Sequence, residues 1–183
     1  LKSTSIGSDE SSAGIAEIAY HQGVDFFLAV DSTRQAITNL MAVGIYHLFE
    51  QQGASLIRKL DPTTCLKTDS TLPELGKILL KQGIRIEALG SHSQLIELQL
   101  VANAIKHGEG RSAKELRRRR PQLFEDYQSS VTSCARAPLR PLVGEGIRLA
   151  DEQVSCYAAD IDRFWVEIKG RLYPDNDMTH KAT

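Results

Sequence analysis

Cysteine is scarce in this chain, and Cys65, Cys134 and Cys156 lie far apart in the sequence. An odd number of cysteines without a close pair predicts neither a disulfide framework nor a cysteine-based zinc site. It is typical of a protein from a reducing cytoplasm. Long apolar runs are also lacking, so no membrane-spanning helix is predicted. The Ser-rich first residues lack the apolar stretch of a signal peptide.

Neither sign of charge is in excess. The chain has 22 Lys and Arg against 23 Asp and Glu, a net charge of -1. This balance argues against a generally cationic nucleic-acid-binding surface but allows a local basic patch. With 183 residues, 42% of them hydrophobic, the chain can form one domain with its own core.

We expect a flexible polar tail at residues 1–20, one domain at 21–173 and a second flexible tail at 174–183. The chain begins with Leu1 and not with Met. We therefore expect it to be trimmed or to be part of a longer polypeptide.

The clearest predicted element is a helix over residues 25–60. Its apolar residues recur at intervals of three and four, which predicts one face turned towards the core. Gly44 and Gly53 each weaken the helix by about 1 kcal/mol relative to Ala, and indicate a bend or a close helix contact. Pro62 ends the helix, because a residue before proline avoids the α region. The expected core stripe consists of Phe26, Val30, Ile37, Leu40, Met41, Gly44, Leu48 and Leu56.

The remaining pattern predicts further helices and scarcely any strand. A second helix begins near Thr71 and continues towards Ile86, and a third covers residues 93–107. Gly108 and Gly110 follow this third helix and are typical of a helix end. Residues 112–115 form a predicted capping box for a short helix that ends before Pro121. Residues 122–150 are expected to be mostly loop, and a last helix covers 151–168. The fold class is therefore all-α, a bundle of four to five helices.

The candidate site is the end of the third helix. Asn103 and His107 are four residues apart and share a face, with Lys106 beside them. Histidine can transfer a proton near neutral pH, and lysine can hold a phosphate. The structural alternative is that Lys106 and His107 only interact with the helix dipole and cap free carbonyls. Because Ile96 and Leu100 make a second apolar side on this helix, we expect a homodimer or partner protein to cover it.

Two other groups of polar residues are weaker candidates. His47 and Glu50 lie one turn apart at the edge of the predicted core stripe and could support a site. The run from Arg117 to Arg120 could bind phosphate. Consecutive helical residues point about 100° apart, so a solvated run with one or two buried stems is the alternative. No spacing demands a metal site.

Two segments of the chain resemble a known group of proteins. AVGIYHLFEQQ, and later LQLVANAIKHGEGRSAKELRRRRPQLF, resemble bacterial proteins with a HEPN-like domain (higher eukaryotes and prokaryotes nucleotide-binding). In arrangement the similarity covers residues 25–172. It implies a helical bundle that often works as a dimer, and a metal-independent RNA endonuclease of a toxin–antitoxin or antiviral system. No cofactor is expected.

The signature of that family is an arginine, usually a polar residue, three variable residues and a histidine. Here the hexad is residues 102–107, in which Asn103 and His107 match and Ala102 replaces the arginine. The resemblance implies that His107 is the acid/base and that Asn103 orients the substrate. Lys106, Arg111 and Arg117 would then contact the RNA.

Three functional classes remain open at this point. The first is a HEPN-like ribonuclease, and the second is a degenerate HEPN-like module that binds a partner protein or RNA without cutting. The third follows from NAIKHG, which also resembles the asparagine box of histidine-kinase-type ATPases. Those ATPases need an α/β sheet, which the sequence pattern does not predict.

Overall fold

The computed structural model of this protein describes residues 9–64, 71–124 and 146–174. Within these ranges no β-strand forms, and one isolated bridge joins Phe124 to Ile147. The predicted all-α fold class is confirmed. The helices are α1 (Asp9–Leu60), α2 (Thr71–Lys81), α3 (His92–His107), α4 (Arg111–Arg119) and α5 (Asp151–Leu172), and 3-10 turns lie at Ile86–Ala88 and Pro121–Leu123.

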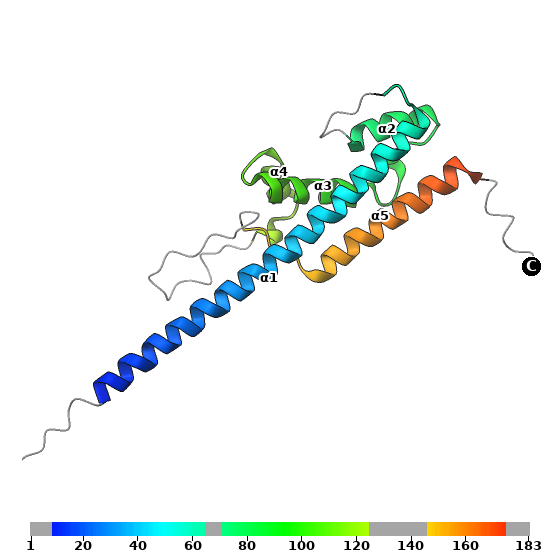
Figure 1. The fold of residues 1–183 in the computed structure, drawn as a ribbon. Helices are drawn as coiled ribbons and strands as arrows, with labels where there is room; N and C mark the ends of the chain where they lie inside the picture. Colours follow the sequence, from blue (N-terminus) through cyan, green and yellow to red (C-terminus); the bar gives the residue numbers. More distant parts are fainter. Residues whose placement is uncertain (1–8, 65–70, 125–145, 175–183) are drawn as a thin grey trace, which may run out of the picture.

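Helix α1 is the longest helix, and three of the other helices pack against it. The C-terminal half of α1 packs against α2, α3 and α5, whereas its N-terminal half projects beyond the other helices (Figure 1). The helix begins at Asp9, so residues 9–20, which we expected in a flexible tail, are helical instead. This stretch has no proline and is rich in Ala, Glu and Ile. Its polar composition indicated solvent exposure, which is compatible with a helix. Residues 1–8 and 175–183 lie outside the described residues.

The core lies where α1, α2, α3 and α5 meet. Phe49 of α1 is fully buried and contacts Phe164 and Trp165 of α5, with ring centroids 5.5 Å apart in both pairs. From α3, the predicted core residues Leu98, Ala102 and Ile105 are all buried. Burying a large apolar side chain contributes about 1.5–3 kcal/mol, so this contact region supplies much of the driving force for folding.

The side of α1 that faces the core is not the one we predicted. Phe26, Val30 and Leu40, like most of the expected stripe, are exposed; only Leu56 packs against the core. The prediction failed because the true inner face includes small and polar residues, which a hydrophobic pattern does not detect. That face consists of Thr38, Asn39, Ala42, Tyr46, Phe49, Gly53 and Ile57.

Asn39 shows how polar residues are accommodated on the inner face. Its amide donates to the carbonyl of Ile147 at 2.9 Å, and Gln35 donates to the carbonyl of Leu149 at 3.0 Å. A buried amide needs such partners because it has lost water. The two contacts hold residues 147–149 against α1 and so fix where α5 begins.

Glycines set two of the connections. Gly108 has a φ of +66° and ends α3 as predicted, and Gly53 lets α1 approach Thr71 at the start of α2. The predicted capping box is wrong, because α4 begins at Arg111 with Gly110 as its N-cap. Ser112 therefore lies inside the helix, and Glu115 pairs with arginines instead. Among the described residues, no helix is long and apolar enough to cross a membrane.

Candidate functional site

The end of α3 presents the predicted polar residues as a group. Lys106 and His107 are exposed in the last turn, and Asn103 is half-buried one turn earlier on the side of His107. The N–H of Gly108 donates to the carbonyl of Ala104 at 2.9 Å and closes the last turn. These three side chains are therefore accessible from one corner of the bundle, the corner between α3 and α4.

Positive charge is concentrated at this corner. Residues 103–120 contain seven Lys and Arg against two Glu, a net charge of +5 with His neutral, whereas the whole chain carries -1. The rest of the chain is thus acidic by comparison. A compact cationic region on an otherwise acidic protein is the pattern expected of a local anion-binding surface.

Part of this charge is neutralised within the corner. Arg118 and Arg119 both donate to Glu115, at 2.7 Å and 2.6 Å, and these bonds lower the pKa of Glu115 to about 2. Arg117 pairs with Glu109, and its guanidinium lies 4.4 Å from the centre of the Phe124 ring. The prediction that Arg117 contacts a substrate therefore competes with contacts that it already makes.

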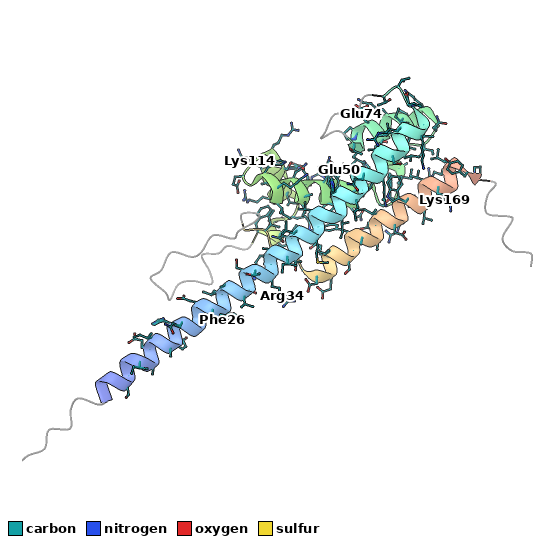
Figure 2. The ribbon with its side chains drawn as sticks, in the orientation of Figure 1. Phe26, Arg34, Glu50, Glu74, Lys114 and Lys169 are labelled. Carbon is teal, nitrogen blue, oxygen red and sulfur yellow. The ribbon has the colours of Figure 1, made fainter. Side chains whose placement is uncertain are left out.

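Three other cations keep their charge available. In the parts of the chain that the structure describes, Lys106, Arg111 and Lys114 are exposed and form no ion pair with a described residue. Lys114 lies on α4 away from the bundle (Figure 2). These side chains lie on both sides of the α3–α4 turn, so together with His107 they make a cationic surface. We call Lys106, His107, Arg111 and Lys114 the basic corner.

Arg120, the last of the arginine run, has a structural role that the sequence did not reveal. It donates two bonds to the half-buried carboxylate of Glu97, at 3.0 Å and 2.9 Å. Glu97 also accepts from Tyr157 at 2.7 Å and from Gln153 at 3.1 Å. The network joins α3, the end of α4 and α5, and it orients the basic corner on the bundle.

The sequence pattern could have suggested only part of this network. Glu97 lies on α3 and was readable as a polar residue within an apolar helix, but its partners come from 23 to 60 residues away. Burial and the bond to Glu97 raise the pKa of Tyr157. Arg117, Arg118 and Arg119 are exposed and Arg120 is half-buried, which agrees with the expected solvated run that has one or two buried stems.

His47 and Glu50 lie on α1 and interact with each other. His47 Nδ1 is 3.9 Å from Glu50 Oε2, and its Nε2 is 3.0 Å from Nε2 of Gln51. None of these contacts reaches the basic corner, so their supporting role there stays a prediction. In the described ranges, no three His, Cys, Asp or Glu residues cluster as a metal site.

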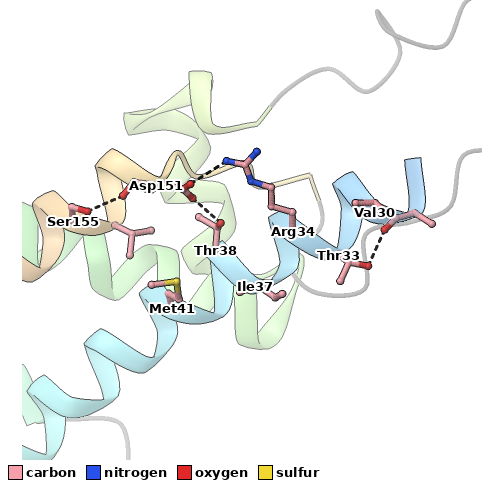
Figure 3. A pocket seen from close by; sticks show the side chains of 10 residues that line it. Val30, Thr33, Arg34, Ile37, Thr38, Met41, Asp151 and Ser155 are labelled. Atoms are coloured by element: carbon pink, nitrogen blue, oxygen red, sulfur yellow. Dashed lines mark hydrogen bonds and ion pairs between the residues drawn. The ribbon is translucent and has the colours of Figure 1, made fainter. Parts of the chain in front are cut away.

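An apolar groove lies between α1 and the start of α5 (Figure 3). Its volume is about 700 Å³, and Val30, Ile37, Met41 and Val154 line it. At its edge Asp151 accepts bonds from Thr38 and Arg34, at 2.9 Å and 3.1 Å, and these lower its pKa. The groove is open and apolar, which suits a protein side chain better than a charged ligand.

Comparisons of the chain with family models, with curated proteins and with solved structures find no match. The function must therefore be argued from the residues of the site.

Proposed function

We propose that this chain is a HEPN-like helical domain whose basic corner binds the phosphate backbone of RNA. The observation that carries the proposal is the group of exposed cations at the α3–α4 turn that form no ion pair with a described residue, in an otherwise acidic chain. Asn103 lies beside them as a hydrogen-bonding group, since its amide both donates and accepts. The resemblance of residues 102–107 to the family hexad indicates RNA as the ligand.

Removal of three charges tests this proposal. The triple variant Lys106→Gln, Arg111→Gln, Lys114→Gln should bind labelled single-stranded RNA more weakly than wild type in a fluorescence anisotropy titration. Each lost phosphate contact lowers the slope of log affinity against log salt by about 0.7, so the slope should fall by about 2.

A matched control removes the same charge elsewhere. The variant Arg58→Gln, Lys59→Gln, Lys169→Gln changes three exposed cations at the far ends of α1 and α5. It should keep the wild-type salt slope. If both variants lose the same RNA affinity, the effect comes from net charge and not from the basic corner. If the corner variant loses no affinity, the proposal is refuted.

RNA cleavage is a second candidate, favoured by Asn103 and His107 sharing one face of α3. The family arginine is missing, and the methyl group of Ala102 is fully buried. The charge on the scissile phosphate would therefore have to be stabilised by Lys106 or Arg111.

The cleavage hypothesis predicts that His107→Ala loses about 10²–10⁴-fold in rate. Asn103→Ala should lose less, and a chelator should have no effect. The measurement is cleavage of structured and single-stranded RNA, with a thermal melt of each variant as the folding control. If wild type binds RNA but cuts neither substrate, the chain is a binding module without nuclease activity. The ATPase alternative has no support, because the described ranges contain no strand.

A further inference from the structure

Helix α1 carries a long exposed apolar surface. Among the described residues, 14 large apolar side chains are exposed, and 11 of them lie on α1. Phe26, Phe27 and Tyr20 are 72%, 68% and 69% exposed. Aromatic side chains bury about 150–250 Å² each, so these three alone offer roughly 300–500 Å². An apolar patch of this size on a monomeric protein is often functional, and the other exposed apolar residues of α1 extend it further.

The spacing on this surface is that of a coiled coil. Nine exposed positions from Ala16 to Gly44 recur at alternating intervals of three and four residues, and none of the nine is charged. Such a seam fits the side of another helix. We call these residues the outer seam: Ala16, Ala19, Gly23, Phe26, Val30, Thr33, Ile37, Leu40 and Gly44.

The charge of the projecting half of α1 argues against two other partners. Residues 9–33 contain five Asp and Glu and no Lys or Arg. Helices that lie on membranes are typically rich in Lys and Arg, and nucleic acid would be repelled. A protein helix is the remaining kind of partner.

The outer seam is complementary to itself when one copy is reversed. Pairing about a point between Asp31 and Ser32 places Phe26 opposite Ile37, and Gly23 opposite Leu40. The projecting half of each α1 then covers the seam on the half that packs against the bundle. Both halves are matched in length, because the seam extends to similar distances on either side of this point. In a parallel pair Gly23 would meet Gly23 and leave a gap.

The groove beside α5 supports the same orientation. Arg34 and Met41 flank the seam on the groove side, and Tyr20 and Phe27 flank it at equivalent heptad positions. In an antiparallel pair, residues at the same flanking heptad position of the two helices lie beside each other. Phe27 of a second copy would then lie at the groove, whereas a parallel copy would present the small side chains of Ala29 and Ala36.

We propose that this chain forms an antiparallel homodimer through the outer seam of α1, with Tyr20 and Phe27 of each copy packed at the α1–α5 groove of the other. This surface lies on α1 and not on α3, where the sequence indicated a partner. On α3, Ile96 and Leu100 are partly buried against the core and so offer a partner less apolar surface than α1 does; a partner on α3 stays a prediction.

Light scattering of the full chain tests the association. Wild type at micromolar concentration should have twice the chain mass of 20.2 kDa. The variant Phe26→Glu, Ile37→Glu places like charges opposite each other and should weaken the dimer at least about 100-fold. The control Leu80→Glu, Val166→Glu changes exposed apolar residues on α2 and α5 and should remain dimeric. A monomeric wild type, or equal effects of the two variants, would overturn the proposal.

A distance measurement tests the orientation. A spin label at position 16, in a variant with all three cysteines replaced by Ser, should report about 45 Å between copies of an antiparallel pair, given a rise of 1.5 Å per residue. A parallel pair would give about 10 Å and would overturn the proposal. Circular dichroism of each variant shows whether the fold is retained. Because Phe26 lies on the projecting half of α1, Phe26→Glu alone provides a second monomer test that leaves the core unchanged.

Discussion

Tyr157 is the residue that most clearly links burial to a measurable property. Its hydroxyl donates to Glu97 at 2.7 Å, and its side chain is buried between α3 and α5. A hydrogen bond to a charged group contributes about 1.5–3 kcal/mol. Because Arg120 and Gln153 remain on Glu97, we expect Tyr157→Phe to lower the free energy of unfolding by an amount near the lower end of that range at neutral pH.

The raised pKa of Tyr157 also predicts a pH effect with a definite sign. Burial, and then the bond to Glu97, favour the protonated phenol in the folded protein. Its contribution is fully present below the ordinary tyrosine pKa of about 10 and is lost as pH rises above it. Urea unfolding at pH 7 and about pH 11 should show a smaller fall in stability for Tyr157→Phe than for wild type. An equal fall would contradict this explanation.

At the residue scale, the sequence predicted where the polar residues at the end of α3 lie and missed the hydrogen-bond network around Glu97. Asn103, Lys106 and His107 were predictable because helical spacing and Gly108 determine where they lie. Glu97, Arg120 and Tyr157 were not, since their contact depends on how α3 and α5 pack. Local spacing therefore shows which residues share a helix face, whereas only the tertiary structure shows which residues from other helices contact them.

At the scale of the helix, two glycines of α1 provide a matched test. Gly44 has no atom within 4 Å of an added Cβ, whereas at Gly53 the Cβ would lie 2.9 Å from Cγ2 of Thr71. In the Phe26→Glu background, where the outer seam is unpaired, Gly44→Ala should raise the free energy of unfolding by about 1 kcal/mol through helix propensity. Gly53→Ala gains the same propensity but must displace the buried Thr71, so it should be neutral or destabilising. Thermal or urea unfolding distinguishes them, and equal stabilisation would contradict the close contact between α1 and α2.

The C-terminal ends of α1 and α3 were predictable, whereas the start of α1 and its orientation were not. Pro62 and Gly108 act on their own backbone, so their effect is visible in the sequence. The inner face of α1 depends on residues 147–151, which bind Thr38 and Asn39 from more than 100 residues away. When a helix has apolar residues on two faces, its periodicity alone does not tell which face packs against the bundle and which one is left for a second copy.

At the scale of the whole molecule, the two proposed surfaces serve different purposes. The outer seam consists of exposed residues of α1, and the basic corner consists of exposed residues at the α3–α4 turn. Dimerisation through the seam would therefore leave both basic corners of the dimer accessible. All-α architecture follows from composition and periodicity, but the separation of these surfaces follows only from the packing of α1 against the bundle.

Photo-cross-linking tests RNA binding at the basic corner most directly. RNA containing 4-thiouridine is cross-linked to the full chain and the protein is cut at glutamates, because trypsin would reduce the Arg-rich segment to very short peptides. Mass spectrometry should locate the cross-links within residues 103–120 and show them lost when Lys106, Arg111 and Lys114 are replaced by Gln. Cross-links concentrated on the outer seam or on α5, and unchanged in that variant, would contradict the proposed function.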